Sequence, residues 1–298
     1  MSFIVSRAMK DKLAARAVRL CAVGTCSLAV VIMIVLAAKS WPLLSSVRLL
    51  DLVVSDEWRP LAGRFGFRAF IIGTLLVTAG AGAIAVPISV LCALYLAEYC
   101  SPRFRAAVAP VMDLMAAIPS VVYGMWGILA VVPAVRFIAR LCGSPSSGYS
   151  VLAASCVLAV MIIPYMAHLC LELFMGVPRG MIEASLSLGA GRWRTVKHVI
   201  LRRTLPGIGA AVGLALCRAL GETMAVLMVA GNVPMIPASL FDPVYPLPAL
   251  IANSYGEMMS VRKYEAALMF AALLLLALML SLSLASRRPF LRIERSVD

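Results

Sequence analysis

Two ionisable side chains, Arg218 and Glu222, lie inside a long apolar stretch of the chain, residues 204–231. A charged side chain near the centre of a bilayer costs about 2.5–3.5 kcal/mol on insertion scales, so such residues are expected to have a function. The four-residue spacing predicts that both side chains share one face of a helix. A guanidinium offers paired, planar donors to the oxygens of an oxyanion and stays charged at physiological pH. The pair therefore predicts either an anion-binding position or a buried structural ion pair.

The composition indicates an integral membrane protein. Of the 298 residues, 62% are hydrophobic and 14% are charged, and the mean hydropathy is +0.97, whereas a soluble domain is closer to half apolar. The net charge of +13 is expected to reflect cytoplasmic loops and anionic lipid headgroups, with no nucleic-acid partner. The eight cysteines form no C-x-x-C pair and the two histidines are far apart, so we expect no metal site.

Six apolar segments are close to or above the roughly 20 residues needed to cross a bilayer. They cover residues 20–38, 69–96, 108–135, 149–173, 205–230 and 264–285. The predicted fold class is an all-α integral membrane protein with six transmembrane helices. An even number of spans puts both termini on the same side of the membrane. Most of the 27 Lys and Arg residues lie in the terminal segments and in the loops on the side of the termini. The positive-inside rule then places both termini in the cytoplasm.

The segment between the fourth and fifth spans, residues 174–208, is long, basic and helix-competent. We predict two short helices, over residues 181–188 and 193–203, which Gly189 and Gly191 separate. Such a pair, lying parallel to the membrane, can plug into a groove on a cytoplasmic partner. An ordinary amphipathic interfacial loop is the alternative.

The letters of this loop, EASLSLGAGRWRTVKHVI, resemble the EAA loop of bacterial ABC-importer permeases. The positions in register with that pattern are Glu183, Ala184, Gly189 and Val199. Ser185 replaces the second alanine, and Arg202 stands where many members of the family have a proline. The stretches 116–133 and 218–232 are similar to phosphate-importer permeases of the PstC type, and the resemblance covers roughly residues 65–285.

This resemblance implies a type I (MetI-like) ABC-importer permease core over residues 69–285, with the EAA loop, at about 174–206, coupling it to an ATPase. Residues 1–68 would be an N-terminal cytoplasmic segment, the first transmembrane helix and a periplasmic loop, and residues 286–298 a cytoplasmic tail. The implied location is the bacterial cytoplasmic (inner) membrane. The implied partners are a second homologous permease, two ATP-binding subunits and a periplasmic or lipid-anchored phosphate-binding protein. The implied function is ATP-driven import of inorganic phosphate by alternating access.

The sequence contains no G-x-x-x-x-G-K-[ST] phosphate loop, so ATP and Mg are expected on the partner ATPase. We therefore expect no cofactor and no enzymatic activity in this chain. His168 is the one histidine inside a predicted span and has no obvious Ser or Asp partner, which argues against an intramembrane enzyme. Asp113 is expected near the start of the third span, where its carboxylate would stabilise the N-terminus of that helix.

An ABC permease for another oxyanion, and a channel or ion-driven carrier, are the alternative functions.

Arg218 is expected to line the substrate path. Glu222 would either accept a hydrogen bond from the proton that HPO4²⁻ carries and sulfate lacks, or hold Arg218 in place. Ser120, Tyr123 and Thr223 are further candidates for the path, although each is more often a polar group satisfied by its neighbours. One arginine cannot balance a doubly charged anion, so we expect the second permease to contribute basic groups.

Overall fold

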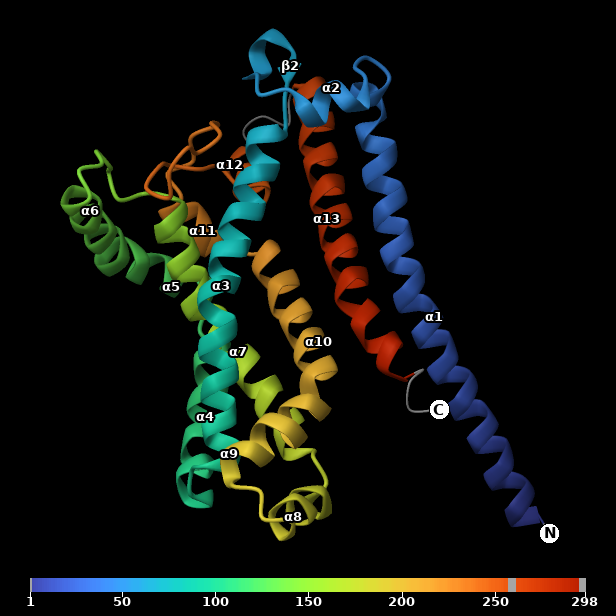
Figure 1. The fold of residues 1–298 in the computed structure, drawn as a ribbon. Helices are drawn as coiled ribbons and strands as arrows, with labels where there is room; N and C mark the ends of the chain where they lie inside the picture. The colour runs from blue at the N-terminus through green and yellow to red at the C-terminus, as the bar shows by residue number, and fades with distance from the viewer. Residues whose placement is uncertain (1, 257–260, 295–298) are drawn as a thin grey trace.

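The computed structural model describes residues 2–256 and 261–294 and consists almost entirely of helices (Figure 1). The elements are α1 (Ser2–Leu44), α2 (Leu49–Val54), β1 (Trp58–Arg59), β2 (Arg64–Phe65), α3 (Arg68–Glu98), α4 (Pro102–Ala117), α5 (Ser120–Trp126), α6 (Val132–Leu141), α7 (Val151–Met175), α8 (Arg179–Ser187), α9 (Arg192–Thr195), α10 (Leu201–Leu220), α11 (Met224–Val229), α12 (Leu247–Ser254) and α13 (Arg262–Glu294). A 3-10 turn, Pro60–Ala62, lies between the antiparallel strands. Two π-helical turns, Gly127–Val131 and Val196–Ile200, join α5 to α6 and α9 to α10.

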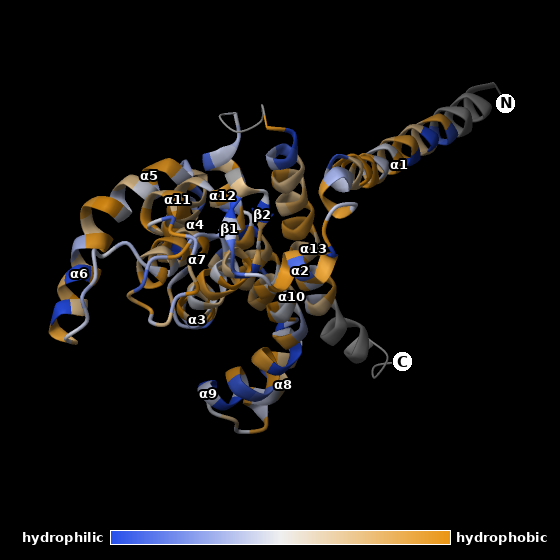
Figure 2. Ribbon diagram, turned by 90° about the horizontal axis from the view of Figure 1, so that it is seen from above, coloured by the Kyte–Doolittle hydropathy of each residue, from blue (hydrophilic) through white to orange (hydrophobic). Residues whose placement is uncertain are grey.

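In the part of the chain that the structure describes, six helices are long and apolar enough to span a membrane, as predicted. The spans are Asp11–Leu44, Arg68–Glu98, Ser120–Leu141, Val151–Met175, Arg192–Leu220 and Arg262–Ser286. Figure 2 shows hydrophobic residues along these helices, with hydrophilic residues on β1 and on parts of α8 and α9. In Figure 1 the β-hairpin lies at one end of the bundle, and α8, α9 and the start of α1 lie at the other.

The third span differs from the prediction over residues 108–135. Helix α4 ends before Ile118, whose backbone is extended, with a φ of −61° and a ψ of 130°, and the spanning helix is Ser120–Leu141. Pro119 explains the break, because proline has no N–H to donate and disfavours helical backbone in the residue before it. The prediction for Asp113 was therefore also wrong: this residue lies past the middle of a separate helix, far from its N-terminus.

The fifth span also differs from the prediction over residues 205–230. One helix runs from Arg192 in the loop through a π-helical turn to Leu220, and the short helix α11 follows as a separate element. The prediction that the second helix of the loop ends at Arg203 was wrong, because this helix continues into the span. Pro206 lies inside this helix. Membrane helices tolerate such prolines because neighbouring groups satisfy the freed backbone.

The core is built around α3 and α7, which make extensive contact with each other. The contact includes small, fully buried residues: Ala81, Ala85, Ala153 and Ala154. The Ser155 hydroxyl donates to the Val77 carbonyl at 3.2 Å, and the Ser89 hydroxyl donates to the Ile163 carbonyl at 3.1 Å. Close approach of small residues and interhelical hydrogen bonds are what hold helices together in lipid. Helix α10 packs on both α3 and α7, and α13 packs between α10 and α1.

Candidate functional site

Arg218 lies in the last turn of α10, and Glu222 lies beyond the end of that helix. The predicted shared helix face is therefore wrong, because the helix ends at Leu220 and α11 begins only after a three-residue connection. Glu222 Oε1 instead accepts a hydrogen bond from the Ala225 backbone N–H at 3.4 Å. That position is in the first turn of α11, where a carboxylate is favourable. Among the described residues, the salt bridges do not include an Arg218–Glu222 pair.

The Arg218 guanidinium is exposed in the single chain and contacts two neighbouring helices. Its Nη2 donates to the Ala116 carbonyl of α4 at 3.3 Å, and its Cζ lies 5.0 Å from the centroid of the Tyr165 ring of α7. Ala116 belongs to the last turn of α4, where carbonyl groups lack partners within the helix. A cation stabilises such a helix end. The bond to Ala116 occupies one of the five N–H donors of a guanidinium.

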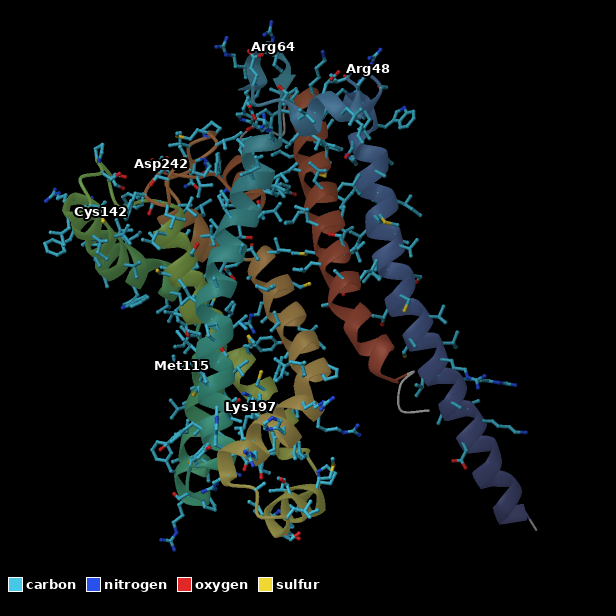
Figure 3. All side chains as sticks on the ribbon, in the orientation of Figure 1. Arg48, Arg64, Met115, Cys142, Lys197 and Asp242 are labelled. Carbon is cyan, nitrogen blue, oxygen red and sulfur yellow. The ribbon has the colours of Figure 1, made fainter. Side chains whose placement is uncertain are left out.

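Tyr123 holds the same helix end from the other side of the break. Its side chain is buried, and its hydroxyl donates to the Met115 carbonyl at 2.8 Å. Figure 3 labels Met115, which lies between the two ends of the bundle. Two predicted path residues, Arg218 from α10 and Tyr123 from α5, thus converge on the last turn of α4.

Ser120 and Thr223 lie where the chain resumes a helix after each break. Ser120 is the half-buried first residue of α5. Thr223 precedes α11, and its hydroxyl donates to the Gly221 carbonyl at 3.3 Å. Helices α5 and α11 pack closely, since a Cβ on Gly124 would lie 3.2 Å from the Cα of Ala225. The structure therefore brings the five predicted path residues to two neighbouring helix breaks.

A cluster of ionisable side chains between α4 and α7 was missed in the sequence. His168 Nδ1 lies 3.3 Å from Asp113 Oδ1, and His168 Nε2 lies 3.4 Å from Glu172 Oε1. The expectation that His168 has no Ser or Asp partner was wrong, because Asp113 of α4 lies beside it. Tyr165, His168 and Glu172 share a face of α7, and their three- and four-residue spacings were a usable signal. Asp113 arrives from another helix, and local sequence carries no sign of that contact.

Helix α8 ends in a glycine turn, as predicted. Gly189 has a φ of +81°, its N–H donates to the Leu186 carbonyl at 2.9 Å, and the Ala190 N–H donates to the Ser185 carbonyl at 3.3 Å. This is the hydrogen-bond pattern of a Schellman motif. The hydroxyls of Ser185 and Thr195 lie 2.9 Å apart and join α8 to α9. The serine at the second alanine position of the EAA pattern thus ties the two parts of the loop together.

The loop exposes most of the residues that the EAA pattern singles out. The exposed ones are Glu183, Ala184 and Gly189, and Val199 is half-buried. Leu188 is 89% exposed and Trp193 is 59% exposed. Large apolar side chains that gather on an exposed loop mark a surface suited to a protein partner. Figure 3 labels Lys197, which lies towards this end of the molecule.

Known proteins show the same organisation in sequence. Residues 85–288 match the family model described as "Binding-protein-dependent transport system inner membrane component". Several curated relatives carry the name "Phosphate transport system permease protein PstC". The protein from Xylella fastidiosa (strain 9a5c) is 33% identical over 256 residues, which is 81% of this chain and 78% of the relative. The Mesorhizobium japonicum protein is 32% identical over 274 residues, 87% and 83% of the two chains. The Pasteurella multocida protein is 35% identical over 256 residues, 80% and 79% of the two chains.

Solved structures share the fold. A chain of the inward-facing MetNI methionine ABC transporter aligns with a TM-score of 0.53 and 23% identity, over 76% of this chain and 91% of that chain. A chain of a bacterial transporter that imports the acidic polysaccharide alginate aligns with a TM-score of 0.56 and 16% identity, over 74% and 79%. Identities at this level support the fold alone, which is the predicted MetI-like permease core.

The protein is a multi-pass membrane protein that belongs to the family of binding-protein-dependent transport system inner membrane components, among permeases of the PstC type.

Proposed function

We propose that the chain is the membrane permease subunit of an ATP-driven importer of inorganic phosphate. The observation that carries the proposal is the similarity to relatives named as phosphate permeases, which extends over 80% or more of this chain. The geometry adds support, because the exposed Arg218 guanidinium lies at neighbouring helix breaks inside the membrane-spanning part. Transporters use such discontinuous helices to turn polar backbone groups towards an ionic substrate.

Arg218 is the proposed phosphate ligand. In the present arrangement its guanidinium bonds to the Ala116 carbonyl and lies over the Tyr165 ring. A phosphate oxygen forms charge-assisted, paired hydrogen bonds with a guanidinium, and these are stronger than a bond to a neutral carbonyl. Phosphate therefore competes for Arg218 and releases the end of α4. Substrate binding and the position of the α4–α5 break are linked through this exchange.

Glu222 is the proposed discriminator between oxyanions. The residue is half-buried and lies four positions after Arg218. Its carboxylate accepts a hydrogen bond from the P–O–H group of HPO4²⁻, and it repels an oxyanion such as sulfate that has no hydrogen to donate. Glu222 thereby favours a protonated anion at a site whose attraction comes from Arg218.

The remaining components are supplied by partners. A second homologous permease completes the charge around the anion, and two ATPase subunits bind ATP and Mg²⁺ and dock on the loop that contains α8. A periplasmic or lipid-anchored phosphate-binding protein delivers phosphate at the end that carries β1 and β2. In this proposal α8 and both termini lie in the bacterial cytoplasm, and the basic residues of those segments support this orientation. The chain itself conducts phosphate and hydrolyses nothing.

Phosphate uptake into proteoliposomes that hold this chain, its companion permease, the ATPase and the binding protein tests the proposal. We expect Arg218→Gln to lower uptake about tenfold or more, because charge-assisted hydrogen bonds to the anion are lost, while assembly and basal ATP hydrolysis are retained. Arg140→Gln is the matched control, since Arg140 is an exposed arginine in α6. Wild-type uptake by Arg218→Gln would reduce Arg218 to a helix cap. Uptake without the ATPase would identify a channel or carrier, and uptake of sulfate in preference to phosphate would identify another oxyanion as the substrate.

A further inference from the structure

Two arginines converge on the C-terminal end of α3. Arg105, near the start of α4, donates from Nε to the Leu96 carbonyl at 2.7 Å and from Nη2 to the Ala97 carbonyl at 2.8 Å. Arg192 donates from Nη2 to the Glu98 carbonyl. The last carbonyls of a helix lack partners within it, and cations near that end are favourable. The two guanidinium groups therefore cover three consecutive carbonyls at the end of the helix.

Arg192 comes from the coupling loop, which is the segment Arg179–Thr195 that contains α8 and α9. It is the first residue of α9. Its Cζ also lies 5.1 Å from the centroid of the Tyr99 ring, directly after α3. Within the loop, the Ser185–Thr195 hydrogen bond joins α9 to α8. A continuous set of contacts thus runs from α8 through Arg192 to α3, the helix with the extensive contact to α7.

We propose that Arg192 is a positioning residue that transmits movement of the coupling loop to α3. The proposal rests on the function proposed above, in which the ATPase subunits dock on α8. A guanidinium that stacks on a ring and bonds to a carbonyl has a defined orientation. Displacement of α8 therefore pulls the inner end of α3 and, through its contact with α7, the helix that carries Tyr165 against Arg218.

A purely structural role for Arg192 is the competing explanation, and the two explanations differ in stability. Arg192 is exposed, and exposed charged contacts add little to folding stability. Arg105 already covers two of the three carbonyls without it. Loss of Arg192 therefore leaves the melting temperature nearly unchanged and affects the link between loop and helix.

Tyr99 provides a test that leaves the coupling loop untouched. Replacing its ring removes the stacking partner of Arg192 but alters no residue of α8 or α9. The full complex in proteoliposomes is compared for wild type, Arg192→Gln, Tyr99→Leu and Tyr99→Phe, and Arg194→Gln serves as a matched control. Arg194 is exposed on the same short helix, so its substitution removes the same charge from the loop. The readouts are phosphate imported per ATP hydrolysed, stimulation of hydrolysis by the loaded binding protein, ATPase retained by the complex, and melting temperature.

We expect Arg192→Gln and Tyr99→Leu to lower the import-to-hydrolysis ratio about three- to tenfold, in the range of known coupling effects. Tyr99→Phe, which keeps the ring, and Arg194→Gln should match wild type. The double variant Arg192→Gln/Tyr99→Leu should be no worse than the more severe of these two single variants, because both substitutions weaken the same contact between the loop and α3.

Three results would overturn the proposal or its premise. An unchanged ratio and unchanged stimulation in Arg192→Gln would show that the contact transmits nothing. A loss of bound ATPase in Arg192→Gln, with Tyr99→Leu normal, would assign Arg192 to the docking surface. The third result would be that the wild-type complex moves no phosphate, while stimulated ATP hydrolysis is still lower in Arg192→Gln and Tyr99→Leu than in wild type. That result would overturn the substrate assignment and support the transmission role.

Discussion

Arg218 satisfies a helix end and presents a cation in the same geometry. Its bond to the Ala116 carbonyl stabilises the end of α4, and its exposure leaves donors for an anion. Membrane interiors make both properties valuable, because an unpaired carbonyl and an unpaired cation are each costly there. Until an anion arrives, an arginine bonded to a carbonyl keeps both groups paired, which is why a residue of this type suits a transport path.

Tyr123→Phe tests whether the break between α4 and α5 depends on side-chain hydrogen bonds. The substitution leaves the Met115 carbonyl without the hydroxyl at 2.8 Å, and we expect a loss of about 1 kcal/mol in stability, typical for a buried hydrogen bond. Thermal unfolding in detergent should show a lower melting temperature. Tyr95→Phe is the control, because Tyr95 is 56% exposed in α3. Equal melting temperatures for the two variants would show that the hydroxyl does not hold the break.

Gly189→Ala tests the turn of the coupling loop. Gly189 has a φ of +81°, which costs a residue with a Cβ about 1–2 kcal/mol. We expect weaker retention of the ATPase by the purified complex. Gly191→Ala is the matched control, since Gly191 has a φ of −67° and a Cβ there would meet nothing within 4 Å. Equal retention by the two variants would mean that the left-handed turn is not needed for docking.

At the scale of the elements, interrupted helices decide where the site lies. Pro119 separates α4 from α5, and the non-helical residues 221–223 separate α10 from α11. Each break leaves polar backbone groups inside the membrane-spanning part, and the packing of α5 on α11 holds the breaks next to each other. The site is therefore a product of two local interruptions and one helix–helix contact.

Gly124→Val tests this contact. A Cβ at Gly124 would lie 2.6 Å from Met228 Sδ and 3.2 Å from the Cα of Ala225, so a larger side chain forces α11 away from α5. Overpacking of this kind costs about 1–3 kcal/mol, and we expect phosphate uptake to fall in the assembled complex. Gly24→Val is the control, because a Cβ at Gly24 in α1 would meet nothing within 4 Å. Normal uptake by Gly124→Val would show that the two breaks move independently.

At the scale of the whole molecule, the exposed apolar residues of the coupling loop point to assembly with an ATPase. Leu188 is 89% exposed at the end of α8. We expect Leu188→Ser to weaken ATPase binding about tenfold or more, as truncation of a buried interface anchor does. Leu141→Ser is the control, since Leu141 is 73% exposed at the end of α6. Co-purification of the ATPase with each variant measures the effect, and equal recovery would place the docking surface elsewhere.

The sequence by itself determined the class of molecule, the number of spans and the position of the coupling loop. Runs of about 20 apolar residues have few structural solutions in a bilayer. Gly189 predicted the end of a helix because glycine readily adopts the left-handed conformation found there. The same reasoning failed for the third and fifth spans, because apolar character continues through helix breaks. Pro119 stands at the first of these breaks, but a proline alone does not say whether it kinks a membrane helix or ends it.

Only the tertiary structure decided which polar groups meet. Arg218 contacts Ala116, which is 102 residues away in the chain, and His168 meets Asp113 of another helix. Arg192 reaches the Glu98 carbonyl from the loop, 94 residues away. A residue's hydropathy and spacing report the helix it belongs to, whereas these contacts depend on how several helices cross and where they end. The transport and coupling roles proposed here rest on those crossings, which local sequence does not encode.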